Sequence, residues 1–180
     1  MTQEVKIPSE RIGVIIGKHG KTRKILEKQL DVTLKVDSNE GIIIITNKEN
    51  SLAEIKTMEI IKAISRGFSP ERAMKLLEDD NIILDLIDIS NDADNPQKLY
   101  RIRGRIIGRN GKSREQIENM TGTYISVYGK TISIIGLPDQ VNDAHTAIIM
   151  LINGSDHNIV FNFLDRRKKE AKMNMISYYY

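Results

Sequence analysis

Two glycine pairs in this chain stand where they could bind an anion. Gly17 and Gly20 are separated by two residues, and so are Gly108 and Gly111. A glycine lacks Cβ, so the backbone can turn sharply there and a ligand can approach it closely. The second glycine of each pair opens a predicted helix, whose first backbone N–H groups have no internal partner and carry the positive end of the helix dipole. Such a helix start favours a phosphate group.

The side chains around both glycine pairs are basic or polar. The windows 11–24 and 101–114 contain no acidic residue, so each predicts a local positive potential that suits a polyanion. Lys18 and His19 lie between the first two glycines, and Arg109 and Asn110 lie between the second two; all four can donate hydrogen bonds. The residues expected to hold phosphates are Gly17, Lys18, His19, Gly20, Lys21, Arg23, Arg105, Gly108, Arg109, Asn110, Gly111, Lys112 and Arg114.

The same segments could be mistaken for a nucleotide-binding P-loop. Gly20-Lys21-Thr22 and Gly111-Lys112-Ser113 match the end of G-x-x-x-x-G-K-[ST]. The first glycine of that motif would fall at Ile15 or Ile106, where a β-branched residue resists the required backbone geometry. The preceding residues also have the pattern of a helix, whereas a P-loop follows a strand. ATP or GTP hydrolysis is therefore not expected.

The elements that position these glycines occur twice. Gly13-Val-Ile-Ile-Gly-Lys-His-Gly-Lys-Thr-Arg aligns with Gly104-Arg-Ile-Ile-Gly-Arg-Asn-Gly-Lys-Ser-Arg at an offset of 91 residues. The pairs Glu27/Glu118, Val36/Val127, Ala53/Ala144 and Ile61/Ile152 follow in register without a gap. Matched spacing over this length indicates two copies of one structural unit.

Hydrophobic periodicity predicts the order β-α-α-β-β-α in each copy, followed by a trailing helix. We therefore expect an α+β fold in which each copy forms a three-stranded sheet packed on helices. The predicted domains are residues 1–80 and 81–173, with a tail at 174–180. The second trailing helix ends in a basic cluster at 166–172, which either extends a polyanion-binding track or forms a solvated helix end. Residues 78–94 hold seven acids and no lysine or arginine; they form a solvated linker or meet a basic partner.

Composition excludes several function classes. The chain of 180 residues has no cysteine and only three histidines, which excludes disulfides and thiol catalysis, argues against a metal site and suits a reducing cytoplasm. Its longest apolar run is too short to span a membrane. The N-terminal residues lack the hydrophobic core of a signal peptide, so we expect no leader. The acids lie away from the glycines, so a metal-dependent nuclease is not expected. We therefore expect a soluble cytoplasmic protein that has no cofactor and is not an enzyme.

The pattern Ile-Ile-Gly-x-x-Gly-Lys within a β-α-α-β-β-α unit resembles the type I KH domain, present twice here. The resemblance implies that each unit clamps about four nucleotides of single-stranded RNA against its glycine loop. It also implies an apolar groove floor, with Ile12, Ile16 and Ile107 as the expected contacts and Ile25, Leu34, Ile117 and Ile125 as further candidates. Packing within the core is the alternative role of these side chains. No aromatic residue is expected at the floor.

The paired units, with 67–73 between them and 121–131 in the second, resemble the archaeal Partner-of-Nob-type KH proteins of small-subunit ribosome assembly. The resemblance implies binding near the 3′ end of small-subunit rRNA or its precursor. It further implies two protein partners, the Nob-type endonuclease and the alpha subunit of translation initiation factor two. A KH-type adaptor for RNA decay and a general single-stranded nucleic-acid-binding protein remain alternatives, because these residues do not distinguish RNA from DNA.

Overall fold

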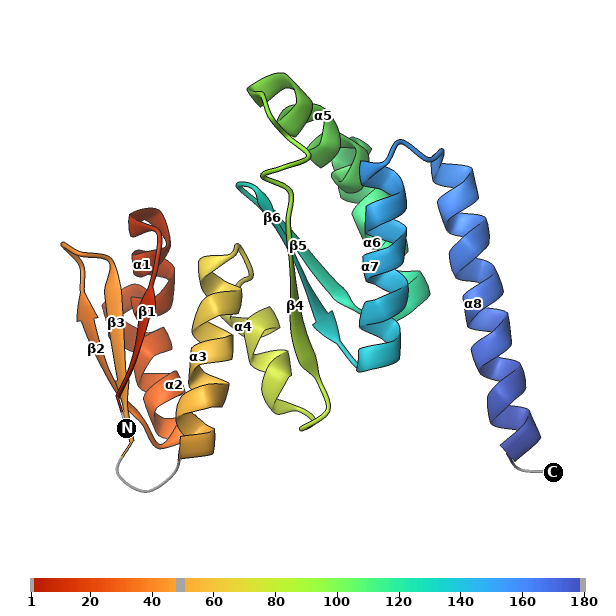
Figure 1. The fold of residues 1–180 in the computed structure, drawn as a ribbon. Helices are drawn as coiled ribbons and strands as arrows, with labels where there is room; N and C mark the ends of the chain where they lie inside the picture. Colours follow the sequence, from red (N-terminus) through yellow and green to blue (C-terminus); the bar gives the residue numbers. More distant parts are fainter. Residues whose placement is uncertain (1, 48–50, 179–180) are drawn as a thin grey trace. The chain divides into compact units, whose positions relative to one another are not determined.

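The computed structural model describes residues 2–47 and 51–178, without the side chains of Thr2 and Ser51. The chain divides into two compact units, Met1–Leu84 and Asp85–Tyr180. Each unit contains one three-stranded antiparallel sheet together with its own helices (Figure 1). We describe the units separately.

Unit 1 has the predicted order of elements. They are β1 (Thr2–Lys6), α1 (Ser9–Ile16), α2 (Lys21–Leu30), β2 (Thr33–Asp37), β3 (Ile42–Thr46), α3 (Ser51–Ser65) and α4 (Pro70–Ala73). A short 3₁₀ turn, Lys18–Gly20, joins α1 to α2, and a second, Met74–Leu77, follows α4. The Ser69 hydroxyl begins α4 by accepting a hydrogen bond from the Arg72 backbone N–H at 3.3 Å, as its position before Pro70 predicts.

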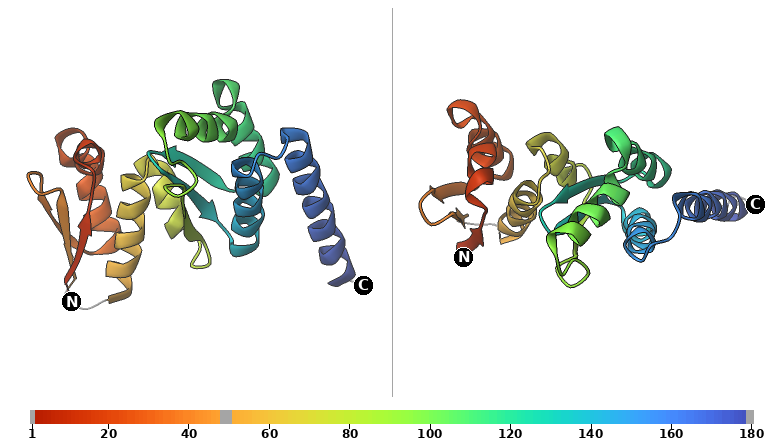
Figure 2. Two further views of the ribbon diagram at one scale, coloured as in Figure 1. Left: turned by 45° about the horizontal axis from the view of Figure 1, so that its top comes forward. Right: turned by 90° about the horizontal axis from the view of Figure 1, so that it is seen from above.

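The sheet of unit 1 places β3 between β1 and β2. Ile43 pairs with Val5 on one side, and Ile45 pairs with Leu34 on the other. Because strand side chains alternate between the two faces, Ile43 and Ile45 point to one face, and both are fully buried. Helices α1, α2 and α3 lie on one side of this sheet (Figures 1 and 2).

Unit 2 repeats this order; its first and last helices are longer than those of unit 1, and the two helices between have the same lengths. Its elements are β4 (Ile83–Asp88), α5 (Pro96–Ile107), α6 (Lys112–Thr121), β5 (Tyr124–Tyr128), β6 (Thr131–Gly136), α7 (Pro138–Ile152) and α8 (His157–Tyr178). The 3₁₀ turn between α5 and α6 is Arg109–Gly111. The strand order is β4-β6-β5, so each unit has its last strand in the centre of the sheet.

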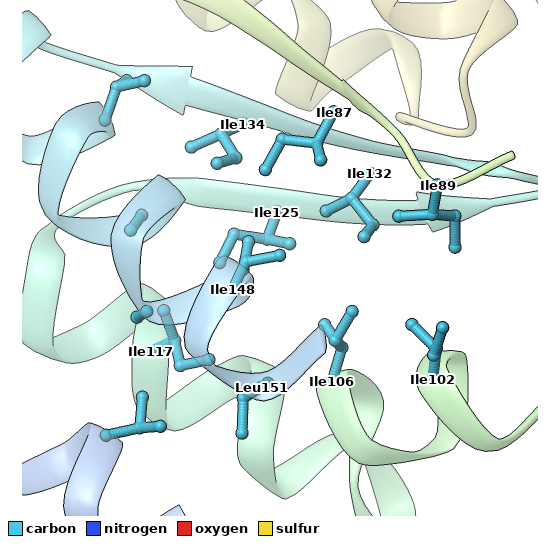
Figure 3. Packing of buried hydrophobic residues seen from close by; sticks show 14 of the residues in the cluster. Ile87, Ile89, Ile102, Ile106, Ile117, Ile125, Ile132, Ile134, Ile148 and Leu151 are labelled. Carbon is cyan, nitrogen blue, oxygen red and sulfur yellow. The ribbon is translucent and has the colours of Figure 1, made fainter. Parts of the chain in front are cut away.

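The core of unit 2 consists mainly of isoleucine. Ile87 and Ile89 from the β4 segment and Ile132 and Ile134 from β6 lie over side chains from α5, α6 and α7 (Figure 3). Every member of this cluster is at least nine-tenths buried. Burial of such side chains stabilises the fold by roughly 1.5–3 kcal/mol each relative to exposure. The same cluster holds the buried sides of α5 and α6 in place, and these two helices carry the second glycine loop between them.

The α+β class and the duplicated order of elements are confirmed. Helix α8 differs from the expectation, because it continues through residues 174–178, where we predicted a tail. No glycine or proline follows Lys172, so nothing in the local sequence stops the helix there. Positions 179 and 180 lie outside the described residues. Across the ranges 2–47 and 51–178, no helix is both long and apolar enough to cross a membrane.

Candidate nucleic-acid interface

The two glycine loops have the same backbone conformation. Gly17 has φ 72° and ψ 171°, and Gly108 has φ 72° and ψ 177°. The third residue of each loop, His19 or Asn110, is left-handed, with φ 53° or 54°. A positive φ is uncommon for a residue other than glycine and recurs at ligand-binding sites. The same unusual path in both units means that the loop geometry belongs to the repeated unit.

The first glycine of each loop is required by close packing. A Cβ at Gly17 would lie 2.2 Å from Thr22 Oγ1, and one at Gly108 would lie 2.6 Å from Ser113 Cβ. The second glycine has space around it, because no atom lies within 4 Å of a Cβ at Gly20 and only Arg114 Nη2, at 3.8 Å, approaches one at Gly111. The first glycine therefore holds the loop tightly over the start of the next helix, and the second lets that helix begin.

The loop side chains are exposed and available to a ligand. They are Lys18, His19 and Lys21 in unit 1 and Arg109, Asn110 and Lys112 in unit 2. Within the part of the chain that the structure describes, none of these side chains makes a hydrogen bond or an ion pair. Neither α2 nor α6 has a side-chain cap at its N-terminus. Each unit thus combines an uncapped, positive helix start with free hydrogen-bond donors, which is the chemistry that a phosphate needs.

Behind the loops, a repeated glutamate ties each helix to the sheet. Glu27 Oε1 accepts the backbone N–H of Leu34 at 2.9 Å, and Glu118 Oε1 accepts that of Ile125 at 2.7 Å. Arg23 Nε also donates to Glu27 Oε1, at 3.1 Å. The cation of Arg23 is therefore partly neutralised within the chain. Arg114 differs, because its buried Nε has no partner among the described atoms.

The basic window predicts that Arg105 faces a phosphate, but its guanidinium lies at the end of another helix. Its Nε donates to Leu151 O at 3.1 Å, and its Nη2 donates to Ser155 O, so the guanidinium caps the end of α7. In unit 1, Arg11 does the same job for α3 by donating to Ile64 O at 2.8 Å and Phe68 O at 2.7 Å. Burial lowers the pKa of the Arg11 guanidinium from its usual value, and Glu10 opposes that shift. Arg105 is therefore not an expected RNA contact, because its guanidinium already donates hydrogen bonds to carbonyl groups at the end of a helix.

The expected groove floor is only partly open. Ile12 is 6% exposed and belongs to the core, which corrects the expectation for this residue. Leu34, Ile117 and Ile125 are also buried in the core, whereas Ile25 is 38% exposed. Ile16 and Ile107 are half-buried and lie directly before the first glycine of each loop. These two isoleucines and Ile25 remain available to a base.

An aromatic residue near the second loop was missed by the sequence analysis. Tyr100 is 83% exposed and stands seven residues before Ile107 on α5. Residues at i and i+7 share one helix face, so the two side chains lie along the same side of α5. The helical spacing of Tyr100, Arg103 and Ile107 indicated that they share one face of the helix, but not that this face is exposed. The structure shows that Ile102 and Ile106 take the opposite, buried face.

The loop region offers no set of metal ligands. Among the described residues, no group of three or more His, Asp or Glu side chains is placed to hold a metal ion. Ser113, a residue 7% exposed beneath Gly108, has a buried hydroxyl without a hydrogen-bond partner among the described atoms. What the site presents is backbone N–H groups, cations and half-buried aliphatic side chains.

Comparison with known proteins places this architecture in a family. Residues 2–58 match the model described as KH domain, and residues 83–169 match the model described as Eukaryotic type KH-domain (KH-domain type I). The chain is 42% identical over 170 residues to KH domain-containing protein MJ0443 of Methanocaldococcus jannaschii, covering 93% of this chain and 74% of the relative. It also resembles a chain in the crystal structure of the a/eIF2alpha-aDim2p-rRNA complex from Pyrococcus horikoshii OT3, with 46% identity, a TM-score of 0.88 and coverage of 94% and 95% of the two chains.

The chain belongs to the Dim2/PNO1 family of KH-domain proteins. The likeness to eukaryotic members is more limited. The Pre-rRNA-processing protein PNO1 of Chaetomium thermophilum is 32% identical over 108 residues, which is 59% of this chain and 42% of that protein. Both glycine loops of this Dim2/PNO1-family chain lie within the regions that match KH models.

The role of Arg105 in this Dim2/PNO1-family protein can be tested by substitution. Arg105→Ala removes two charge-assisted hydrogen bonds from the end of α7, and we expect unit 2 to lose about 1–3 kcal/mol of stability. Differential scanning calorimetry measures this loss. The matched control is Arg103→Ala on the same helix, because Arg103 is half-buried and makes no ion pair or hydrogen bond within the described structure. An unchanged transition for Arg105→Ala would show that the cap contributes nothing.

Proposed function

We propose that this protein is a non-enzymatic single-stranded RNA-binding protein that acts in small-subunit rRNA processing. It grips the precursor near the 3′ end of small-subunit rRNA through its two glycine loops. The observation that carries this proposal is the presence of two loops of one geometry, each with free cations beside an uncapped helix start. A relative of 46% identity was crystallised in a complex with rRNA, which supports the choice of ligand.

The proposed contacts follow the geometry of each loop. Backbone N–H groups and the side chains of Lys18, His19, Lys21, Arg109 and Lys112 hold phosphates. Half-buried Ile16 and Ile107 contact bases. The remaining members of the proposed site are Gly17, Gly20, Arg23, Gly108, Asn110, Gly111 and Arg114. Ile12 and Arg105 are not part of the proposed site, because Ile12 packs in the core and the Arg105 guanidinium donates to the end of α7.

Two loops on one chain bind more strongly than either alone. Once the first loop holds the strand, binding of the second is intramolecular, and the avidity can exceed either affinity by about 10² to 10⁴. This gain needs no catalytic group. In this proposal the protein binds the precursor and presents it to an enzyme. We also propose that it works in the cytoplasm without a cofactor.

Two protein partners belong to the proposal. The alpha subunit of translation initiation factor two is supported by the P. horikoshii complex, which contains a/eIF2alpha together with aDim2p and rRNA. The Nob-type endonuclease stays a prediction from the family resemblance. The two alternative functions, an RNA-decay adaptor and a general single-strand binder, differ from the proposal in the strand that they prefer.

Binding titrations at several salt concentrations test the proposal. The probe is a labelled single strand with the 3′-terminal sequence of small-subunit rRNA, and the controls are a scrambled RNA and the matching DNA. With about four to six phosphates neutralised, log K should fall against log salt with a slope of about −3 to −4. Preference for the 3′-terminal RNA supports the proposal. Equal affinity for all three strands favours a general single-strand binder, and no binding overturns the proposal.

A further inference from the structure

Helix α8 extends well past the core of unit 2. Val160 and Leu164 are its buried residues, and every described side chain after Leu164 is exposed except that of Arg167, which is half-buried. Residues 165–178 therefore continue the helix without support from the core. Most of the stability of a helix in a protein comes from packing, so this end of α8 has little reason of its own to remain helical.

The charges on this exposed end do not balance. Residues 165–178 hold five basic and two acidic side chains. Asp165 is paired with Lys169 at 2.7 Å, and Glu170 is paired with Arg167 at 3.0 Å, so neither acid is left for another cation. The cations that make no hydrogen bond or ion pair within the described structure are Arg166, Lys168 and Lys172. This end of α8 therefore carries a positive charge that the fold does not compensate.

The usual internal reasons for such cations do not apply here. A cation favours the carboxyl end of a helix within the last turn, where it meets the negative end of the helix dipole, and the last turn of α8 holds no basic residue. Lys168 and Lys172 are four residues apart, so they share one helix face and repel each other. Two unpaired lysines side by side weaken the helix that carries them, unless an anion lies between them.

Helix α8 begins close to the second glycine loop and leads away from it. The Nε2 atom of His157, its first residue, donates to Arg105 O at 2.8 Å, and Arg105 lies in the last turn of α5, just before the loop. Further along, Lys168 lines one groove with Met120 at the end of α6. At 1.5 Å per residue, Lys168 and Lys172 lie roughly 17 and 23 Å along α8 from His157. A strand held in the second loop can therefore reach them with a few further nucleotides.

We propose that the exposed end of α8 is a separate RNA-binding site, which holds the phosphate backbone of the strand outside the two glycine loops. The inference rests on the proposed function. Lys168 and Lys172 contact phosphates as point charges, and Arg166 adds a third cation. Because these cations lie in the unit whose loop holds the strand, RNA is the anion that they meet. Phosphate contacts carry no sequence information, so the site lengthens the bound strand and leaves the choice of sequence to the loops.

Replacing Lys168 and Lys172 together by glutamine tests this site. The first probe is a strand of about 12 nucleotides with the 3′-terminal rRNA sequence, which suffices for two units of about four nucleotides each. Two further probes double this length, one toward the 5′ end and one toward the 3′ end. The variant should bind the short strand like the parent. It should bind an extended strand about tenfold more weakly, with a salt slope reduced by about 1.4 for two lost phosphate contacts.

Two control variants separate a contact from a general effect of charge. Lys168→Arg with Lys172→Arg keeps both cations and should bind every strand like the parent. Lys6→Gln with Lys28→Gln removes two exposed lysines from unit 1 that have no partner within the described structure. It changes the net charge equally, and we expect it to affect short and extended strands alike.

The outcomes distinguish this inference from the proposed function. If the glutamine variant at Lys168 and Lys172 binds both extended strands like the parent, the site proposed here is wrong, the proposed function stands and α8 faces another anion, such as an acidic protein surface. An equal loss for short and extended strands also overturns the site, because it reports net charge alone. If the parent binds none of the strands, the proposed function and this inference both fail.

Discussion

Replacing Arg109 and Asn110 together by aspartate is expected to weaken binding of single-stranded RNA by about 100-fold or more. The exchange removes a free cation and a free amide from the second loop and adds two carboxylates beside phosphates. Loss of charge-assisted hydrogen bonds costs about 1.5–3 kcal/mol each, and loss of one of two tethered sites removes the avidity gain as well. The fold should persist, because both side chains are exposed and aspartate tolerates the left-handed conformation of residue 110.

Fluorescence anisotropy with a labelled strand measures this change, and a thermal melt checks the fold. The chain supplies its own control: Arg109→Lys with Asn110→His gives the second loop the side chains of the first and should bind close to the parent. Lys18→Asp with His19→Asp tests the first loop in the same way. Parental affinity in both aspartate variants would exclude the loops as the binding site.

Gly108→Ala is expected to destabilise unit 2 by about 3 kcal/mol or more. Gly108 has φ 72° and ψ 177°, a conformation that only glycine adopts readily. In addition, the new Cβ would lie 2.6 Å from Ser113 Cβ and 2.8 Å from the Ser113 backbone nitrogen, and backbone cannot move aside as a flexible side chain can. Strain of this kind costs about 1–3 kcal/mol, and overpacking adds a similar amount.

Calorimetry of the full chain should show the transition of unit 2 falling by about 12 °C or more. Gly111→Ala is the matched control three residues away. It shares the positive φ, at 76°, but its nearest neighbour is the flexible end of Arg114 at 3.8 Å. Its cost should be about 1–2 kcal/mol. Equal losses in the two variants would mean that the contact with Ser113 does not constrain the loop.

Three glycines within eight residues of one segment therefore have three different roles. Alanine at Gly104, inside α5, should stabilise because alanine is the better helix former, whereas alanine at Gly111 should destabilise modestly and alanine at Gly108 should destabilise strongly. The spacing of Gly108 and Gly111 predicted a sharp turn before a helix. The sequence did not show that a Cβ at Gly108 would collide with Ser113, whereas one at Gly104 would meet no described atom within 4 Å. The collision depends on where the fold places Ser113.

The repeat explains why so much of the fold was predictable. The order of strands and helices in each copy is the one that periodicity predicts, and α2 and α6 begin directly after the second glycine of each loop, as predicted. These signals are local, since alternation and helical spacing depend on neighbouring residues. The end of α8 was not predictable in this way, because residues 174–178 carry no stop signal and only the folded chain shows that the helix continues.

The candidate site was predictable in its loops and less so in the residues around them. The amino-acid sequence alone determined that two glycine turns would each carry cations onto a helix start, because residue type and spacing suffice for that. The tertiary structure alone decided that Arg105 turns toward Leu151 and Ser155, that Ile12 is buried and that Tyr100 is exposed. The direction of a helical side chain depends on which face of its helix packs against the sheet and on α3 or α7, and those partners lie some fifty residues away along the chain.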